Sequence, residues 1–248
     1  MRFIAVLTVL LLFAPLPAAL AASTAASPVT VPAATNDLSA DDFGLPPPPP
    51  PVYDPLQSFN RKVFWLNDKL YFYLFKPVAR AWRVVPRGAR TSVGNFFSNL
   101  TAPVRFVNDI FQGRVTDAST ELGRFFLNTT VGIGGLFDPA RKEGLKAKDE
   151  DFGQTLGHYG VGPGPYLVLP VLGPANVRDG FGKVVDLFLD PTTYLLTTPE
   201  NLGAKGTDME NGLSLDKGTY EAIKRDSLDP YLFIRNAYDQ RRRAQIGR

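Results

Sequence analysis

The 248-residue sequence contains no cysteine and only one histidine. Without cysteine, the chain has no disulfide, no thiol nucleophile and no thiolate metal site. His158 alone is too little for an imidazole metal site. A Ser-His-Asp hydrolase would have to use His158, but the sequence has no Gly-x-Ser-x-Gly motif. We therefore predict no catalytic residue, no metal site and no cofactor, and we expect that the protein is not an enzyme.

A strong excess of one charge is also missing. The 27 Lys and Arg residues and the 24 Asp and Glu residues give a formal net charge of +3. The basic residues are dispersed, apart from Arg241-Arg242-Arg243 near the end. Nucleic-acid binding requires a basic stripe interleaved with aromatic residues that stack on bases. A terminal triplet is more typical of a solvated helix end, so nucleic acid is not expected as a partner.

Long apolar runs are confined to the first residues. Met1 and Arg2 precede an apolar run from Phe3 to Leu16, and Ala19-Leu20-Ala21 supplies the small-x-small pattern that signal peptidase recognises. The run is short for a retained membrane anchor, which needs about 20 residues. We therefore predict a cleavable signal peptide over residues 1–21. A bacterial lipoprotein also needs a cysteine directly after its signal, so we expect an exported protein that is not lipid-anchored.

The remaining chain divides into a linker and one domain. Residues 22–52 are rich in Ala and Pro and end in six prolines, which predicts a disordered segment with a stiff polyproline spacer. Residues 53–248 are predicted to form a mainly α domain with little or no sheet. The expected helices are 54–75 (with Asp54 as N-cap, stopped by Pro77), 87–100, 103–111, 116–128 (capped by Thr116), 176–189, 209–225 and 231–245. A long loop region rich in Gly and Pro is expected over 136–174, in which 165–171 is compatible with a strand.

The first predicted helix has more apolar surface than one face can hold. At 100° per residue, one broad face, expected to meet the core, carries Phe59, Val63, Leu66, Leu70, Tyr73 and Leu74. Phe64, Tyr71 and Phe75 lie on the far side, where polar residues would be expected. Such a helix is buried in a large core or in lipid, and on this helix alone both interpretations stay open. Phe-rich stripes recur in the later helices, which favours a continuous apolar belt against a membrane.

Motifs in a fixed order carry a resemblance to a known family. They are Asp54-Pro55-Leu56, Phe59-Asn60-Arg61, Lys76-Pro77-Val78-Ala79, Ala81-Trp82-Arg83, Asn95-Phe96, Asn99-Leu100, Val107-Asn108, Phe111-Gln112-Gly113, residues 124–129, 132–135 and 151–157, Tyr159-Gly160-Val161, Gly164-Pro165-Tyr166, Leu169-Pro170, Gly173-Pro174, Arg178-Asp179 and Asp229-Pro230-Tyr231. Over residues 53–243 the chain thus resembles the MlaA/VacJ family of bacterial outer-membrane phospholipid-transport proteins.

The resemblance implies a fold and a function. It implies a ring-like bundle of amphipathic helices at the periplasmic leaflet of the outer membrane. It also implies a channel that removes misplaced phospholipid from the outer leaflet, passes it to a periplasmic lipid carrier and so maintains lipid asymmetry. A trimeric porin is the further partner implied. The alternatives are a porin-associated structural protein without transport and a lipid hydrolase.

Amide and cationic side chains beside aromatic rings suit a path on which a head group meets polar atoms and acyl chains meet apolar ones. In the first helix, the predicted lipid path consists of Phe59, Asn60, Arg61, Phe64 and Asn67. The alternative is that Asn60 and Arg61 only cap neighbouring helices.

A gating loop is predicted from the Gly-rich stretch after the fourth helix. Its residues are Gly132, Gly134, Gly135, Asp151, Phe152 and Gly153. Glycines suit a hinge, although a rigid connector that needs positive φ would use them too. A nucleotide-binding loop is not indicated, because the stretch lacks a Lys-Ser/Thr ending and a preceding strand.

Overall fold

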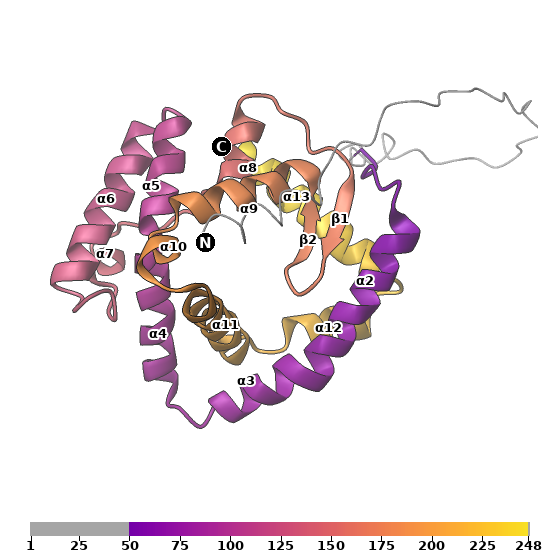
Figure 1. Ribbon diagram of the computed structural model, residues 1–248, viewed down its shortest axis with the longest axis horizontal. Coiled ribbons are helices and arrows are strands. Elements are labelled where there is room, and N and C mark those ends of the chain that lie inside the picture. Colours follow the sequence, from indigo (N-terminus) through magenta and orange to yellow (C-terminus); the bar gives the residue numbers. More distant parts are fainter. Residues whose placement is uncertain (1–49, 248) are drawn as a thin grey trace, which may run out of the picture. The chain divides into compact units, whose positions relative to one another are not determined.

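The computed structural model describes residues 50–247 (Figure 1). The predicted signal peptide and nearly all of the predicted linker lie outside the described residues, and the domain start near Tyr53 stays a prediction. The elements are α2 (Gln57–Leu70), η3 (Tyr71–Phe75), α3 (Lys76–Trp82), α4 (Arg87–Leu100), α5 (Ala102–Phe111), α6 (Val115–Thr130), α7 (Pro139–Lys142), α8 (Phe152–His158), β1 (Tyr166–Leu169), β2 (Gly173–Asn176), α9 (Val177–Leu189), α10 (Thr192–Leu195), α11 (Thr198–Leu215), α12 (Thr219–Asp226) and α13 (Pro230–Ile246).

The mainly α class is confirmed. Within the described unit, α2, α3, α4, α9 and the β1–β2 hairpin follow one another around a loop, as the ring-like arrangement predicts (Figure 1). Helix α11 packs against both α3 and α4, while α5 packs on α6 and α8 packs on α9. The contacts with α3 and α4 position α11, which lines the functional site described below.

The expected loop region 136–174 is more ordered than predicted. It contains α7, α8 and strand β1, and β1 pairs with β2 as an antiparallel hairpin with Tyr166 opposite Asn176. The strand predicted near 165–171 is therefore confirmed, whereas the structureless loop is wrong. The two short helices begin where Asp138 and Asp151 accept hydrogen bonds from the backbone N–H groups of Arg141 and Gln154, so their aspartates are helix caps rather than loop residues.

Pro77 does not end the first helix. Instead, α2 passes into the π-helical turn η3 and then into α3, with Pro77 in the first turn of α3. A proline ring inside a regular α-helix clashes with the carbonyl four residues earlier, which here belongs to Tyr73 within the π turn. A π turn is wider than an α turn, so the ring is accommodated where the hydrogen-bonding pattern changes.

Two predicted caps and one predicted helix are also wrong. Leu56 and not Asp54 is the N-cap of α2, and Arg114 and not Thr116 precedes α6. The helix predicted over 209–225 is in fact the second half of α11 followed by α12, with a break at residues 216–218. Gly218 supplies this break because its φ of 91° lies in the left-handed region.

The interior of the described domain is unusually polar. The largest fully buried side chains are Gln154, Glu121, Asn60, Asn108, Asn211 and Asp109. The apolar core cluster is small by comparison and consists of Val63, Tyr166, Val168 and Tyr231. Buried polar groups need hydrogen-bond partners, so directional contacts between helices, rather than a large apolar core, position the elements of this fold.

Large apolar side chains are correspondingly exposed. On the first helix, much of the face expected to meet the core is outside: Phe59, Tyr73 and Leu74 are 58%, 77% and 50% exposed, although Val63 on the same face is buried. Exposed aromatic residues recur on the later helices, as the Phe-rich stripes predict; they include Phe96, Phe111, Phe126, Phe181 and Phe188. Within residues 50–247, no helix is both long enough and apolar enough to span a membrane.

Candidate functional site

An apolar cavity of about 710 Å³ lies between α2, η3, the hairpin, α11, α12 and α13. Its volume is within the range of about 300–1,000 Å³ found for ligand cavities. The lining residues are Phe64, Asn67, Tyr71, Phe75, Tyr166, Val168, Val171, Leu172, Gly173, Pro174, Lys205, Met209, Leu213, Asp216, Thr219, Tyr220, Ile223 and Ile234. Most of these side chains are aliphatic or aromatic, so the cavity suits hydrocarbon more than a polar ligand.

The far side of the first helix faces this cavity. Phe64, Tyr71 and Phe75 all line it. These are the residues on the side of the helix where polar residues would be expected. The helix therefore lies between the cavity on one side and exposed aromatic residues on the other. This position explains why neither face of its second half is polar.

Of the five residues predicted for the lipid path, Phe64 and Asn67 line the cavity. Asn67 holds the hairpin loop: its Nδ2 donates to the carbonyl of Leu169 at 2.9 Å, and its Oδ1 accepts from the N–H of Val171 at 2.8 Å. Val171 has a φ of +66°, which is rare and strained for a β-branched residue. Asn67 thus fixes a strained loop that forms part of the cavity wall.

We expect Asn67→Ala to lower stability by about 1–2 kcal/mol, because it leaves two hydrogen-bonding groups of the loop without a partner. Backbone amides at 170–173 should then exchange faster in hydrogen–deuterium exchange mass spectrometry. Asn67→Asp is the matched control, since it keeps the acceptor for Val171 and loses only the donor, and it should give a smaller change. Unchanged exchange in Asn67→Ala would show that the loop does not depend on this side chain.

The other three residues of the predicted lipid path do not line the cavity. Asn60 is fully buried, and its amide joins Asp54, the carbonyl of Tyr166 and the N–H of Val168. Arg61 forms an ion pair of 2.6 Å with Asp229, the N-cap of α13. Asn60 thus binds strand β1 and Arg61 pairs with a capping residue, so both side chains connect neighbouring elements, but neither caps a helix itself as the alternative expects. Phe59 is exposed on the outer face.

The Gly-rich part of the predicted gating loop is closely packed. Ile133, Gly134 and Gly135 all have positive φ, and a Cβ on Gly135 would lie 2.6 Å from the Cβ of Asn99. A Cβ on Gly132 would lie 2.3 Å from the carbonyl oxygen of Asn128. Glycine is therefore required here because neighbouring atoms leave no room for a side chain or because φ is positive. Both reasons agree with the alternative of a rigid connector. Gating stays a prediction.

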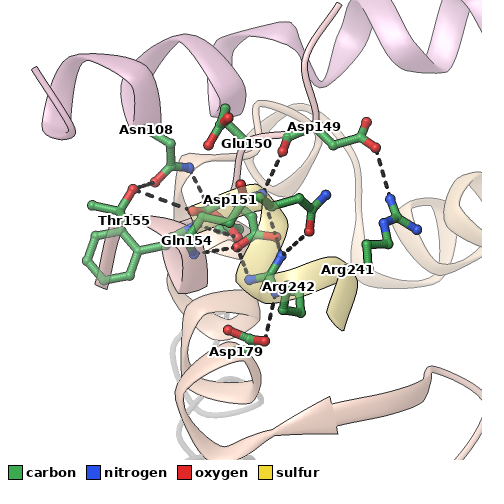
Figure 2. A network of polar contacts seen from close by, with 12 residues as sticks. Asn108, Asp149, Glu150, Asp151, Gln154, Thr155, Asp179, Arg241 and Arg242 are labelled. Carbon is green, nitrogen blue, oxygen red and sulfur yellow. Dashed lines mark hydrogen bonds and ion pairs between the residues drawn. The ribbon is translucent and has the colours of Figure 1, made fainter. Parts of the chain in front are cut away.

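The second part of the predicted gating loop lies in a network of polar contacts (Figure 2). Asp151 caps α8 and forms two contacts with the Arg242 guanidinium, at 2.7 Å and 2.8 Å. The Nε of Arg242 also donates to Asp179 at 2.8 Å. Gly153 packs directly against Gly182, because a Cβ on Gly182 would lie 2.3 Å from the N atom of Gly153. These contacts anchor α8 to α9 and α13.

The two acids that pair with Arg242, Asp179 and Asp151, have lowered pKa values. Burial on its own would raise the pKa of Asp179, but the Arg242 and Tyr238 hydrogen bonds outweigh burial and hold that pKa below its usual range. Asp151 behaves in the same way, because its pair with Arg242 outweighs burial and lowers its pKa. Phe152 joins the same cluster by donating its backbone N–H to Asp186 at 3.2 Å. In the part of the chain that the structure describes, no group of His, Asp and Glu could hold a metal ion.

The sequence pattern missed most of the residues that line the cavity. Met209 and Leu213 lie on α11, and Tyr220 and Ile223 lie on α12. One local signal could have placed α11 correctly. Thr197 and Glu200 form a capping box, with Pro199 in the first turn, and this combination marks a helix start at 198.

These features define a class of protein. A helical domain with a polar interior, an apolar cavity and an aromatic outer surface is built to contact lipid rather than to bind a polar substrate. A sequence model of the family described as "MlaA lipoprotein" matches residues 52–245. The chain belongs to this family, which confirms the resemblance found in its motifs.

Relatives of known name agree with this assignment. "Intermembrane phospholipid transport system lipoprotein MlaA" of Escherichia coli is 41% identical over 196 residues, covering 76% of each chain. The protein of the same name from Haemophilus influenzae is 32% identical over 192 residues, covering 75% of this chain and 76% of the relative. A solved structure described as the structural basis for maintenance of bacterial outer membrane lipid asymmetry is 39% identical and covers 78% of this chain and 98% of its own, with a TM-score of 0.66.

The same names correct one expectation. The family is described as a lipoprotein family, and both named relatives are lipoproteins. The expected location is therefore wrong in denying a lipid anchor. That expectation rested on the missing cysteine alone, and residues 1–49 lie outside the described residues.

Proposed function

We propose that this protein transports phospholipid and so maintains the lipid asymmetry of the outer membrane. The observation that carries the proposal is the apolar cavity of about 710 Å³, enclosed by helices whose outer faces expose aromatic side chains. Exposed aromatic residues favour a lipid interface, and an apolar cavity inside them offers acyl chains a place away from water. The names of the E. coli and H. influenzae relatives support the same function.

Transport of this kind requires no bond to be made or broken. The acyl chains would lie against Phe64, Phe75 and Leu213, where leaving water is favourable by roughly 25 cal/mol per Å² of apolar surface. We place the source of lipid in the outer leaflet and its recipient in a periplasmic lipid carrier, with a trimeric porin as the neighbour in the membrane. No catalytic residue is needed, so His158 has no chemical role in this proposal.

A deletion strain tests the proposal. Loss of the protein should raise the amount of outer-leaflet phospholipid, measured with an amine-reactive label that does not cross the membrane, and the wild-type gene should restore the normal amount. His158→Ala should restore it equally well, because no hydrolytic step is involved. Unchanged outer-leaflet phospholipid in the deletion strain would favour a structural protein without transport, and failure of His158→Ala alone would favour a hydrolase.

A further inference from the structure

A second cavity, of about 360 Å³, adjoins the apolar one. The two cavities share the lining residues Tyr71, Leu213 and Asp216, so they meet at η3 and the C-terminal end of α11. Six basic and two acidic side chains line the second cavity, which we call the basic cavity: Lys76, Arg80, Arg83, Arg87, Arg90, Lys217, Asp216 and Glu221.

Three of the six basic residues build the wall of the basic cavity. Arg90 is buried and its Nη1 donates to the carbonyl of Ser214 at 2.6 Å. The Nη2 of Arg83 donates to the carbonyl of Asp216 at 2.9 Å. The carbonyl groups at the end of a helix carry partial negative charge and favour cations. Lys76 is held by an ion pair of 2.6 Å with Glu221.

The other three basic residues, Arg80, Arg87 and Lys217, are exposed and form no ion pair with any residue in 50–247. The two acids of the basic cavity are already engaged. The Asp216 carboxylate accepts from the N–H groups of Gly218 and Thr219 at 2.8 Å and 2.9 Å, and Glu221 is paired with Lys76. The basic cavity therefore keeps an uncompensated positive charge.

Single exposed cations on a protein surface are normally solvated and have no ligand. Here three of them line one concave site, and that site borders an apolar cavity. This combination matches the two ends of an amphiphile, because the acyl chains and the charged head group of one molecule have to be accommodated side by side.

We propose that the basic cavity binds the phosphate group of a phospholipid whose acyl chains lie in the apolar cavity, with Arg80, Arg87 and Lys217 as the binding residues. The inference rests on the proposed phospholipid transport. Guanidinium groups match phosphate oxygens in a bidentate geometry, and lysine adds a point charge. Both kinds of contact are present in the three residues.

The charge of the basic cavity also implies a head-group preference. A zwitterionic head group brings an ammonium group along with its phosphate, and that ammonium would need an acidic partner. Asp216 and one oxygen of Glu221 are occupied by other groups, and the second oxygen of Glu221 is buried, so the basic cavity offers no accessible acidic partner. Lipids with a net negative head group, such as phosphatidylglycerol, are therefore bound more tightly than phosphatidylethanolamine.

The test compares lipid binding to the full chain in detergent. The triple variant Arg80→Gln, Arg87→Gln, Lys217→Gln removes three of the six positive charges from the basic cavity. The matched control is Arg141→Gln, Lys142→Gln, Lys146→Gln, which removes three exposed cations that line neither cavity and form no ion pair in the described part of the chain. Pyrene-labelled phosphatidylglycerol, phosphatidylethanolamine and diacylglycerol are titrated by fluorescence, and circular dichroism checks that each variant is folded.

The wild-type protein and the control should bind phosphatidylglycerol more tightly than phosphatidylethanolamine. The triple variant should bind phosphatidylglycerol about tenfold more weakly, which corresponds to one or two charge-assisted contacts, and should bind diacylglycerol as the wild type does. Equal binding of phosphatidylglycerol by the triple variant and the control would overturn the inference and leave the transport function standing. If the wild-type protein bound none of the three lipids, the transport function itself would fail.

Inorganic phosphate distinguishes the source of the phosphate group. It has no acyl chains, so it should displace labelled phosphatidylglycerol only at concentrations far above that of the lipid. Displacement by inorganic phosphate at concentrations equal to that of phosphatidylglycerol would identify a free-anion site and overturn the inference.

Discussion

Met209→Trp is expected to stop phospholipid transport while the protein stays folded. Met209 lies on α11 and lines the apolar cavity, where it is only half-buried. A tryptophan ring there would enter the space that the acyl chains need. Overpacking a filled core destabilises by about 1–3 kcal/mol, but here the added volume enters an open cavity, so the penalty to stability should be smaller than the loss of function.

The measurement is the amount of outer-leaflet phospholipid in a deletion strain that expresses the variant. With Met209→Trp this amount should approach that of the deletion strain. Leu202→Trp is the control, because Leu202 lies on the same helix, is 73% exposed and does not line the cavity; it should restore the wild-type amount. Full restoration by Met209→Trp would mean that lipid takes a path outside this cavity.

Elements with strong local signals were predicted well from the sequence. The helix expected at 87–100 has these bounds in the structure, and the last helix begins at Asp229-Pro230 as predicted. In α13, Asp229 accepts from the N–H of Leu232, three residues ahead, and such a contact depends only on neighbouring residues. Local signals of this kind are readable without knowledge of the fold.

The predictions are wrong where the same local sequence pattern is compatible with more than one structure. Pro77 normally ends a helix, but the π turn η3 lets the helix continue. Helix α11 was misplaced because its apolar residues are not gathered on one side, since it contacts both α3 and α4. As α11 and α12 supply much of the cavity wall, this error also hid most of the site.

The roles of the asparagines depend on contacts that no local pattern reveals. Asn60 and Asn67 bind the hairpin more than 100 residues further along the chain. From the sequence, both amides were equally suited to a polar lipid path. Only the structure separates Asn60, which is buried between elements, from Asn67, which reaches the wall of the cavity.

The sequence correctly predicts that the first helix has more apolar side chains than one face can hold. It does not predict which side of the helix faces outward. Helical periodicity shows that two sides of the first helix are apolar, and it says nothing about which side faces out. The structure places Tyr73 outside and Tyr71 on the cavity. For a protein that contacts lipid on its outer face, hydrophobicity alone does not distinguish inside from outside, and polar burial is the better guide to the interior.

The second large expected effect concerns the polar interior. Arg242→Met should lower the free energy of unfolding by about 3 kcal/mol. Methionine keeps much of the apolar stem of the side chain but removes the charge that pairs with Asp151 and Asp179. Breaking a buried ion pair by removing one partner destabilises by about 3–5 kcal/mol. The low end applies, because Arg178 still contacts Asp179 and the Asp151 side chain is 38% exposed to water.

Arg241→Met is the matched control for Arg242→Met. Arg241 is the preceding residue on the same helix, and its ion pair with Asp149 is exposed at both ends (67% and 79%). Exposed pairs contribute about 0–1 kcal/mol, so this variant should be nearly as stable as the wild type in guanidinium titrations followed by circular dichroism. Equal losses for the two arginines would show that the network in Figure 2 does not stabilise the fold through its buried charge.

The pH dependence gives an independent check on Arg242→Met. In the wild type, the pKa values of Asp151 and Asp179 are lowered, so their stabilising contribution is present above about pH 4 and is lost as the pH falls through the lowered values. In the variant, loss of the guanidinium lets both pKa values rise from these lowered values, so protonation relieves the buried charge at a higher pH than in the wild type. The difference in unfolding free energy between wild type and variant should therefore be largest at pH 7 and should shrink as the pH falls toward 4. A difference that stayed constant between pH 7 and pH 4 would assign the loss to packing rather than to charge.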